Sequence, residues 1–531
     1  MQQQISIKLL PSEADNNDVV KAYIAASAGK RLEEIVGFYP IKKSIDARGK
    51  RIFLNLSYHV FINEPFVERK LAKVDFKDVH KAQRKVIVVG AGPAGLFAAL
   101  TLIENGIQPI ILERGKDVRS RRRDLAVLNK EGIVNPESNY CFGEGGAGTY
   151  SDGKLYTRSS KRGDINRILN LFVQFGAEQH ILVDAHPHIG TNKLPQIITS
   201  IRQTITDCGG LFLFEKKVVD FTIESNEIKK VVTADGDQYL AEAVILATGH
   251  SARDIFTLLH NKDVLIEAKP FALGVRIEHP QSIIDGIQYH CNPRSEFLPP
   301  ASYSLVEQVQ QKGVFSFCMC PGGIIAPAST NPGELVVNGW SPSKRNNPFA
   351  NSGMVVSVEQ KDILDLKEFK NYLKNAEVDL GSPLNMMYFQ KMVEGKAYNA
   401  GGGQFKAPAQ RMTDFCNNRR SSSLPACSYL PGITSTNLKD VLPDFIHQRL
   451  QEGLKAFGKK MNGYFTNEAV VVATESRTSS PVRIPRDSNR FHHPQIHNLY
   501  PCGEGAGYAG GIVSAAMDGE RIAAIIAANG S

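Results

Sequence analysis

The feature that constrains this chain most is residues 86–95, an apolar strand sequence that leads directly into Gly-Ala-Gly-Pro-Ala-Gly. A helix-forming stretch and a second apolar strand at 109–112 follow, and Glu113 comes directly after that strand. Glycines at this spacing let the backbone and a helix N-terminus approach a pyrophosphate, and an acid after the next strand accepts hydrogen bonds from a ribose. The pattern predicts a Rossmann-like unit for an ADP-containing dinucleotide, with contacts from Gly90, Gly92, Pro93, Ala94, Gly95, Glu113 and Arg114.

Two later segments favour FAD over NAD as that dinucleotide, and a third is a candidate cofactor loop. Residues 143–148 repeat the glycine spacing without a preceding apolar strand, which indicates a backbone loop along a cofactor. Residues 241–249 predict a buried strand that ends in a small turn, and residues 499–524 predict a strand, an acid, a glycine pair and a helix. A flavin dinucleotide is long enough to need that second helix N-terminus. The further predicted FAD contacts are Gly145, Gly146, Ala147, Gly148, Thr149, Val219, Ala247, Thr248, Gly249, Gly503, Glu504, Gly510, Gly511 and Ile512.

The composition is that of a water-soluble globular protein of several domains. The chain has 531 residues, of which 42% are hydrophobic and 22% are charged. No apolar run of signal-peptide or membrane-spanning length is present, so a cytoplasmic location without membrane contact is expected. The net charge of +8 is too small for this length to argue for nucleic-acid binding by itself.

The order of segments predicts three domains. Residues 1–84 alternate as strand, helix, strand and strand, which predicts a small α+β domain. Residues 85–260 and 465–531 are assigned to a discontinuous dinucleotide-binding domain. Residues 261–464 are assigned to an inserted mixed domain that carries the substrate side of the site.

Catalytic candidates lie outside the glycine motifs. Cys318 and Cys320 are candidates for a redox pair, with packing as small buried hydrophobes as the alternative. Arg477 is a candidate for binding a substrate carboxylate or stabilising reduced flavin, with an ion pair to Glu475 as the alternative. The eight cysteines include no CxxC, which argues against a zinc ribbon, an iron–sulfur cluster or a disulfide-reductase dithiol, and no metal site is predicted.

The arginine-rich stretch 114–123 has two interpretations. It is either a solvated helix face or a site for cofactor phosphates or an anionic substrate.

Five segments together resemble a bacterial family of FAD-dependent dehydrogenases, often labelled NAD(FAD)-utilizing, that carry an FAD-dependent-protein C-terminal domain. The segments are 90–113, FGEGGAGTYSDGKL at 142–155, FSFCMCPGG at 315–323, TESRTSSPVRI at 474–484 and GEGAGYAGGIVSAAMDG at 503–519. The resemblance implies an α/β fold with a glutathione-reductase-type, Rossmann-like FAD-binding domain and an inserted mixed α+β domain. It also implies FAD as cofactor, but it does not supply a substrate.

The predicted function is that of an FAD-dependent oxidoreductase that passes a hydride between flavin and a small organic substrate or NAD(P)H. NAD(P)H is expected only as a transient donor, because no second strand-glycine-helix unit of NAD type occurs. Two alternatives stay open: a flavin-dependent RNA-modifying enzyme, and an FAD-binding or sensor protein without turnover. Nucleic acid is the less favoured partner, and the sequence leaves the oligomeric state open.

Overall fold

The computed structural model describes residues 1–157 and 163–529 of the chain. Its N-terminal unit is a three-stranded antiparallel sheet in the order β1-β3-β2, and helices cover one face. Ile5, Ile7 and Leu9 alternate with polar residues along β1 and pack against Val20 and Ile24, so the pattern of period two defines the buried face. The bounds are β1 (Gln2–Leu9), α1 (Pro11–Ala14), α2 (Asn17–Ala28), β2 (Ile35–Asp46) and β3 (Phe53–Ile62).

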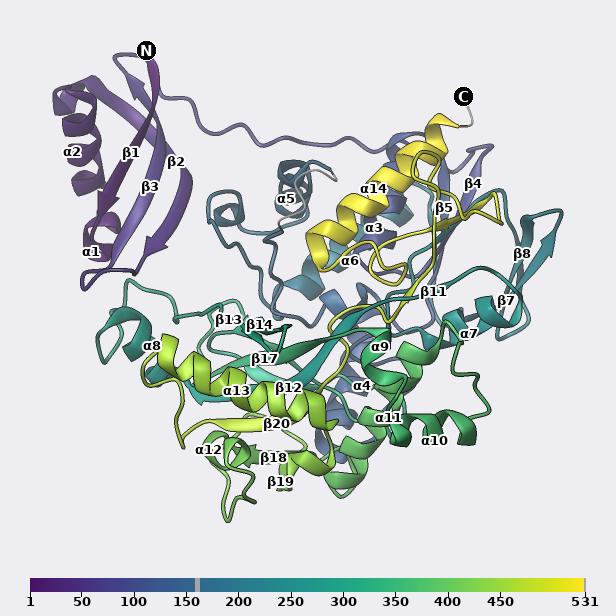
Figure 1. Ribbon diagram of the computed structural model, residues 1–531. Helices are drawn as coiled ribbons and strands as arrows, with labels where there is room; N and C mark the ends of the chain where they lie inside the picture. The colour runs from purple at the N-terminus through teal and green to yellow at the C-terminus, as the bar shows by residue number, and fades with distance from the viewer. Residues whose placement is uncertain (158–162, 530–531) are drawn as a thin grey trace.

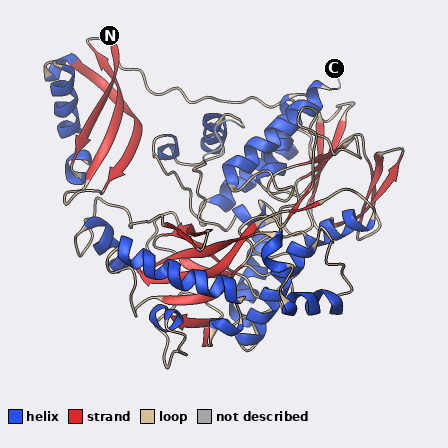
Figure 2. Cartoon of the chain, in the orientation of Figure 1, coloured by secondary structure: helices blue, strands red, loops and turns tan. Residues whose placement is uncertain are grey.

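A long loop joins this unit to the remainder of the chain (Figure 2). The edge strand β2 also meets the body of the protein directly. Lys43 exchanges backbone hydrogen bonds of 2.9 Å with Val183 and Ala185. The N-terminal unit therefore has its own apolar core and is held to the larger part through main-chain contacts.

The next part is a five-stranded parallel sheet in the order β22-β10-β4-β5-β6. Helices α3 and α14 lie side by side on one face of it (Figure 1). A Cβ on Gly519 of α14 would lie 2.0 Å from the Ala94 carbonyl oxygen of α3, so glycine allows this close approach. The bounds are β4 (Lys85–Val89), α3 (Pro93–Glu104), β5 (Gln108–Leu112), α4 (Val118–Glu131), α5 (Ile165–Gln174), α6 (Leu194–Asp207), β6 (Leu211–Leu213), β10 (Val244–Leu246), β22 (Leu499–Pro501) and α14 (Ile512–Ala528).

A small antiparallel sheet, β7-β8-β9, lies between β6 and β10 in the chain, and α7 packs against it. Its bounds are β7 (Val218–Glu224), β8 (Glu227–Thr233) and β9 (Gln238–Leu240), and α7 is Arg253–Asn261.

The largest sheet has seven strands in the order β13-β14-β17-β12-β20-β18-β19, and every neighbouring pair except β18 and β19 is antiparallel. Its central strands β12, β17 and β20 are buried along almost their whole length, which explains their runs of valine and alanine. The strands are β12 (Phe271–Pro280), β13 (Val306–Val309), β14 (Lys312–Cys320), β17 (Phe349–Val358), β18 (Ala407–Arg411), β19 (Ile433–Ser435) and β20 (Val470–Glu475). The helices of this region are α8 (Gln281–Tyr289), α9 (Gln360–Ile363), α10 (Lys367–Asn375), α11 (Asn385–Ala400), α12 (Met412–Cys416) and α13 (Asp444–Lys460).

Two short antiparallel pairs complete the strands. They are β11 (Glu267–Ala268) with β21 (Val482–Arg483), and β15 (Ile324–Pro327) with β16 (Val337–Trp340).

The structure differs from the sequence-based prediction in one element that borders the site. This element is β20, which ends at Glu475 and is followed by a loop at residues 476–481. β20 also belongs to the seven-stranded sheet, although residues from 465 onward were assigned to the dinucleotide-binding domain. The division into domains by residue range stays a prediction. Within the described ranges, no helix has the length and apolarity needed to cross a membrane.

Candidate functional site

A cavity lies between the five-stranded and seven-stranded sheets, and residues of both line it. The loops after β4, β5 and β10, the N-terminus of α14 and strand β14 all contribute to its lining. The structure thus brings together segments that are far apart in the sequence. The predicted site residues that line the cavity are Gly90, Gly92, Pro93, Ala94, Glu113, Arg114, Gly146, Ala147, Gly148, Ala247, Thr248, Gly249, Cys318, Cys320, Arg477, Glu504, Gly510, Gly511 and Ile512.

Five predicted cofactor contacts are not part of this lining: Gly95, Gly145, Thr149, Val219 and Gly503. A Cβ on Gly95 would lie 2.0 Å from the Gly90 carbonyl oxygen, so Gly95 allows α3 to pack on the strand. Thr149 is buried and its hydroxyl donates to the Glu144 carbonyl at 2.7 Å. Val219 is 41% exposed on the outer surface. The side chain beside it, Val218, lines the cavity instead because neighbouring strand residues point to opposite faces.

Four glycines form an open surface on one side of the cavity, which we call the glycine wall (Gly92, Gly249, Gly510 and Gly511). A Cβ added at any of the four would meet no heavy atom within 4 Å, so each leaves free space toward the cavity. Gly92 is the N-cap residue of α3 and Gly511 is the N-cap residue of α14. The glycine wall therefore presents two helix N-termini, whose free N–H groups favour negatively charged ligand groups.

The loop at 145–149 passes between these two helix ends. A Cβ on Gly146 would lie 3.0 Å from Gly92 Cα, and one on Gly148 would lie 3.5 Å from the Ile512 side chain. The Gly145 N–H also donates to the Ala91 carbonyl at 2.9 Å. This second glycine motif is thus a loop beside the first, as expected, rather than a second strand-to-helix turn.

Glu113 connects three loops of the site. Its Oε2 accepts the Ala91 N–H at 2.9 Å, and its Oε1 accepts the N–H groups of Gly115 at 2.8 Å and Gly143 at 3.0 Å. The residue is 4% exposed. Because Oε2 accepts a single bond, it retains a lone pair for a ligand hydroxyl. Glu113 therefore has a structural role that the sequence motif did not indicate.

Arg121 of α4 is fully buried and holds the loop before the second glycine motif. Its guanidinium donates to the carbonyl oxygens of Asn139, Tyr140, Glu144 and Gly146 at 2.8–2.9 Å. The interpretation of this arginine as a phosphate or substrate ligand is wrong, because it does not line the cavity and four of its five N–H groups donate to the backbone.

The other arginines of the basic stretch divide between solvent and the cavity. Arg119, Arg122 and Arg123 are exposed. Arg114 lines the cavity, forms ion pairs with Glu137 at 2.6 Å and Asp254 at 2.9 Å, and lies over the Phe142 ring at 4.1 Å.

The opposite side of the cavity carries charged groups, and we call it the charged wall (Lys154, Arg276, Glu394, Glu475 and Arg477). Lys154 and Arg477 line the cavity. Glu394 pairs with Arg477 and Arg253, and Arg276 pairs with Glu475. Arg276 is fully buried and forms an ion pair with Glu475 at 2.9 Å. The alternative pairing of Arg477 with Glu475 is therefore wrong, since the Glu475 carboxylate is used by Arg276.

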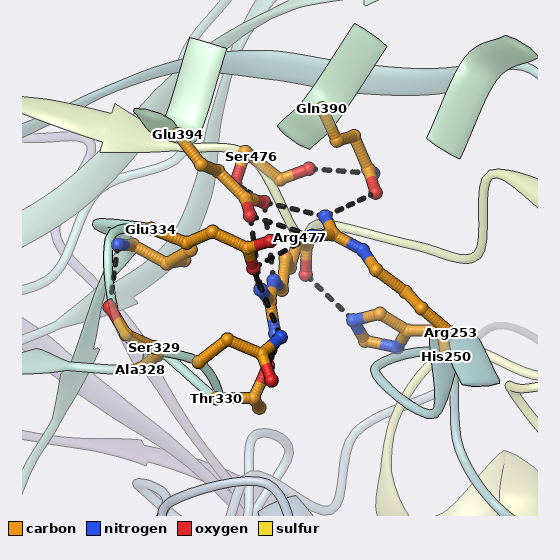
Figure 3. Close-up of polar contacts among 12 residues, drawn as sticks. His250, Arg253, Ala328, Ser329, Thr330, Glu334, Gln390, Glu394, Ser476 and Arg477 are labelled. Atoms are coloured by element: carbon orange, nitrogen blue, oxygen red, sulfur yellow. Dashed lines mark hydrogen bonds and ion pairs between the residues drawn. The ribbon is translucent and has the colours of Figure 1, made fainter. Parts of the chain in front are cut away.

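Arg477 is paired with Glu394 of α11 instead (Figure 3). Glu394 is fully buried and accepts hydrogen bonds from Arg477 at 3.0 and 3.2 Å and from Arg253 at 2.8 and 2.9 Å. Burial disfavours the carboxylate, but the two arginines outweigh burial and lower the pKa of Glu394 to about 2. Glu334 lies 3.1 Å from Arg253 and 3.2 Å from Arg477, so the two arginines face two carboxylates.

His250 was not predicted and joins the two sides of the cavity. Its Nε2 lies 3.1 Å from the Arg477 carbonyl oxygen, and its Nδ1 lies 3.6 Å from Glu504 Oε2 (Figure 3 shows the first contact). The residue directly follows the predicted Ala-Thr-Gly turn, so extending that motif by one position would have identified it.

Cys318 and Cys320 do not simply alternate along a strand, because β14 contains a bulge between Phe317 and Cys320. Cys318 has a φ of 46° and is exposed, whereas Cys320 is buried. Since Cys318 lines the cavity, its exposed surface faces the site. Desolvation by the protein that encloses the cavity raises the pKa of the Cys318 thiol to about 11, although Lys154 and Arg276 lower it. The thiol is therefore neutral at pH 7, and a redox role for the pair stays a prediction.

Comparison with known sequences identifies the family. Residues 270–478 match the family described as FAD-dependent protein, C-terminal domain-like, and residues 83–129 match an FAD binding domain. Residues 195–268 match the family Glucose inhibited division protein A, and residues 1–61 match a domain of unknown function. The chain is 38% identical over 529 residues to an uncharacterized protein of Clostridium beijerinckii, with 96% of both chains covered.

The chain belongs to this family of FAD-dependent, dehydrogenase-like proteins. FAD is the cofactor, as the glycine motifs predicted. The glycine wall fits it, because Gly92 and Gly511 leave space for phosphate and flavin groups beside two helix N-termini.

Two more distant similarities concern parts of the chain or its general shape. The tRNA uridine 5-carboxymethylaminomethyl modification enzyme MnmG of Alkaliphilus metalliredigens is 32% identical over 167 residues, which is 31% of this chain and 24% of that protein. Among solved structures, a salicylate hydroxylase substrate complex aligns with 84% of this chain and 79% of its own at 12% identity and a TM-score of 0.34. That structural similarity is too low to bear on the function of this chain.

Proposed function

We propose that the protein is an FAD-dependent dehydrogenase in which a hydride passes between a small organic substrate, or NAD(P)H, and the flavin. The observation that carries the proposal is that one cavity is lined by two helix N-termini and also by Arg477, which is paired with buried Glu394. FAD, when bound, supplies a ring that accepts or donates a hydride.

Residues of the chain itself would bind and orient the cofactor. The glycine wall would hold the phosphates, and the free lone pair of Glu113 would accept a ribose hydroxyl. Glu504 lines the cavity near the N-terminus of α14 and would bind the ribityl chain. His250 lies between Glu504 and the Arg477 carbonyl and would hold these two parts of the site in register.

Arg477 is less suited to bind a substrate carboxylate than its sequence position suggested. Its Nε and both Nη groups already donate to Glu394, Glu334 and Thr330. We therefore propose that Arg477 positions the His250 contact and the loop after β20.

The proposal is tested by anaerobic titration of the purified, flavin-containing protein with NADH and then NADPH, followed through the oxidised-flavin absorption bands. Rapid bleaching by either nucleotide would support a nicotinamide-dependent dehydrogenase. If both leave the flavin oxidised, candidate organic substrates are screened in the same assay. Failure of every donor would favour an FAD-binding or sensor protein without turnover.

RNA modification is the second candidate, because the 167 aligned residues are similar to a tRNA-modifying enzyme. It predicts that the full chain retains tRNA on a filter at low salt and releases it as salt rises, since phosphate contacts release counterions. The absence of retention at low salt would eliminate this candidate.

A further inference from the structure

Lys154 presents a charged group to the cavity and has one long carboxylate contact, to Asp152. Its side chain is 36% exposed and lines the cavity, so the exposed surface faces the site. The ammonium lies 3.6 Å from the nearest Asp152 oxygen, longer than a charge-assisted hydrogen bond, and 3.7 Å from the Cys320 sulfur. Burial disfavours its charge, but Cys320 and Asp152 outweigh burial and raise the pKa of Lys154. Lys154 is therefore charged at pH 7.

The charges around Lys154 leave an excess of one cation. Asp152 is paired with Arg345 at 3.0 Å, and Glu475 is paired with Arg276 at 2.9 Å. Among the described residues, Lys154, Arg276 and Arg345 thus share these two carboxylates, and the group carries one positive charge in excess. Burial raises the pKa of Glu475 in spite of Arg276, and protonation of Glu475 would only increase the positive excess.

The neutral groups near Lys154 do not offset this charge. Burial lowers the pKa of His188 to about 4, so its imidazole is uncharged at pH 7. The Cys318 thiol is protonated, as described above, because its pKa is about 11.

Asn338 adds a second donor on the same side. Its Oδ1 accepts hydrogen bonds from the Gly339 N–H at 2.7 Å and from Arg276 at 3.3 Å, and two donors at that atom identify it as the oxygen. Among the described residues, the Asn338 NH2 group has no hydrogen-bond partner, and the side chain is exposed at the cavity. Arg276 links the two donors, because it also lies 3.6 Å from the Cys320 sulfur that contacts Lys154.

The surfaces next to these donors are apolar. Phe317, Ala326 and Trp340 line the same cavity. A ligand that fits this region therefore has one anionic end and an organic body. One uncompensated positive charge matches a carboxylate, which carries a single negative charge, better than a phosphate monoester, which carries between one and two at pH 7.

We infer that Lys154 and Asn338 form a binding site for the carboxylate of an organic acid, which is the substrate class of the dehydrogenase. The ammonium of Lys154 and the free NH2 group of Asn338 would each donate to the carboxylate oxygens, and the organic part would lie against Phe317 and Trp340. This inference rests on the proposed function, because it assigns the substrate to the same cavity as the flavin.

The test uses the FAD-containing protein and benzoate as the carboxylate probe, with the change in the bound-flavin spectrum as the readout. Wild type should show a saturable change with benzoate and none with inorganic phosphate at equal concentration. Lys154→Met should weaken benzoate binding about 10- to 100-fold, the range for one charge-assisted hydrogen bond, whereas Lys154→Arg should stay within a few-fold of wild type. Lys361→Met is the matched control, because the Lys361 side chain is 75% exposed and pairs with Glu359 on the surface.

Several outcomes would overturn the inference. They are unchanged benzoate binding in Lys154→Met, no spectral change in flavin-loaded wild type, or phosphate binding as tight as benzoate binding. A loss of FAD affinity in Lys154→Met, measured by flavin release, would assign this lysine to the cofactor instead. Failure of the proposed function is recognised separately, because it would appear as protein without bound flavin or as flavin that no donor reduces.

Discussion

The two sides of the cavity present different chemical groups to a ligand. The glycine wall offers backbone N–H groups and empty space, and none of its four residues has a side chain. Apart from Lys154, the charged wall is built from buried ion pairs whose partners are far apart in the sequence, Arg276 with Glu475 and Arg477 with Glu394. A backbone surface depends on local spacing, whereas the ion pairs depend on the whole fold.

This difference predicts that the two walls respond to mutation in different ways. A change in the glycine wall should affect the ligand and leave the fold intact. A change in the charged wall should affect folding first, because an unpaired buried charge is costly.

The largest effect is expected from Glu394→Ala. The substitution leaves Arg253 and Arg477 with Glu334 as their remaining carboxylate, so we expect a loss of about 3–5 kcal/mol in the free energy of unfolding. Urea denaturation followed by circular dichroism measures this loss. The control is Glu368→Ala, whose side chain is 57% exposed and pairs with Lys396, with an expected loss below about 1 kcal/mol. Equal losses of unfolding free energy in the two variants would contradict the expected difference between buried and exposed ion pairs.

A smaller effect of about 3 kcal/mol is expected on acidification, through His279 of β12. This histidine is fully buried, its Nε2 donates to the Tyr464 carbonyl at 2.8 Å, and burial lowers its pKa to about 4. The unfolded chain binds a proton below about pH 6.5 that the folded chain does not bind, so this contribution to stability is complete above that pH and is lost toward pH 4.

Urea denaturation at pH 7, 5.5 and 4.5 measures this decline. His279→Gln keeps an N–H donor for Tyr464 but does not titrate, so its stability should fall less over the same range. A decline as steep as that of wild type would assign the pH dependence to other groups.

Gly92→Val is expected to change the free energy of unfolding least, although it should abolish FAD binding. Gly92 has a φ of −74° and open space around its Cβ position, so the fold accepts a side chain that then occupies the cavity. We expect colourless protein with the free energy of unfolding of the apoprotein. This variant should lack the stabilisation that bound FAD provides, which is about 2.7 kcal/mol when free FAD is at a hundredfold excess over its Kd.

Flavin content per chain, and thermal unfolding with and without added FAD, measure both parts of this prediction. Gly49→Val in the N-terminal unit is the control and should keep wild-type flavin content, because its Cβ position is also nearly open and is outside the cavity lining. Normal flavin in Gly92→Val would contradict the position of the cofactor.

The sequence predicted the backbone parts of the site better than the side-chain parts. The strand and glycine pattern at 86–95, Glu113 and the second helix start at Gly511 were all recognisable, because a tight turn at a helix N-terminus requires particular residues at fixed spacing. Arg121 was misread, because an arginine that donates only to carbonyl oxygens has no signature in a basic stretch. The partner of Arg477 was missed for a related reason, since Glu394 precedes it by 83 residues on another element.

Trp340, on the cavity surface beside Gly339, is the one tryptophan in the chain. A flavin absorbs light at the wavelengths that an indole emits, so energy transfer should dim the fluorescence of this side chain when the site is filled. Because the chain has no second tryptophan, the fluorescence intensity of Trp340 should report the fraction of protein molecules that carry FAD.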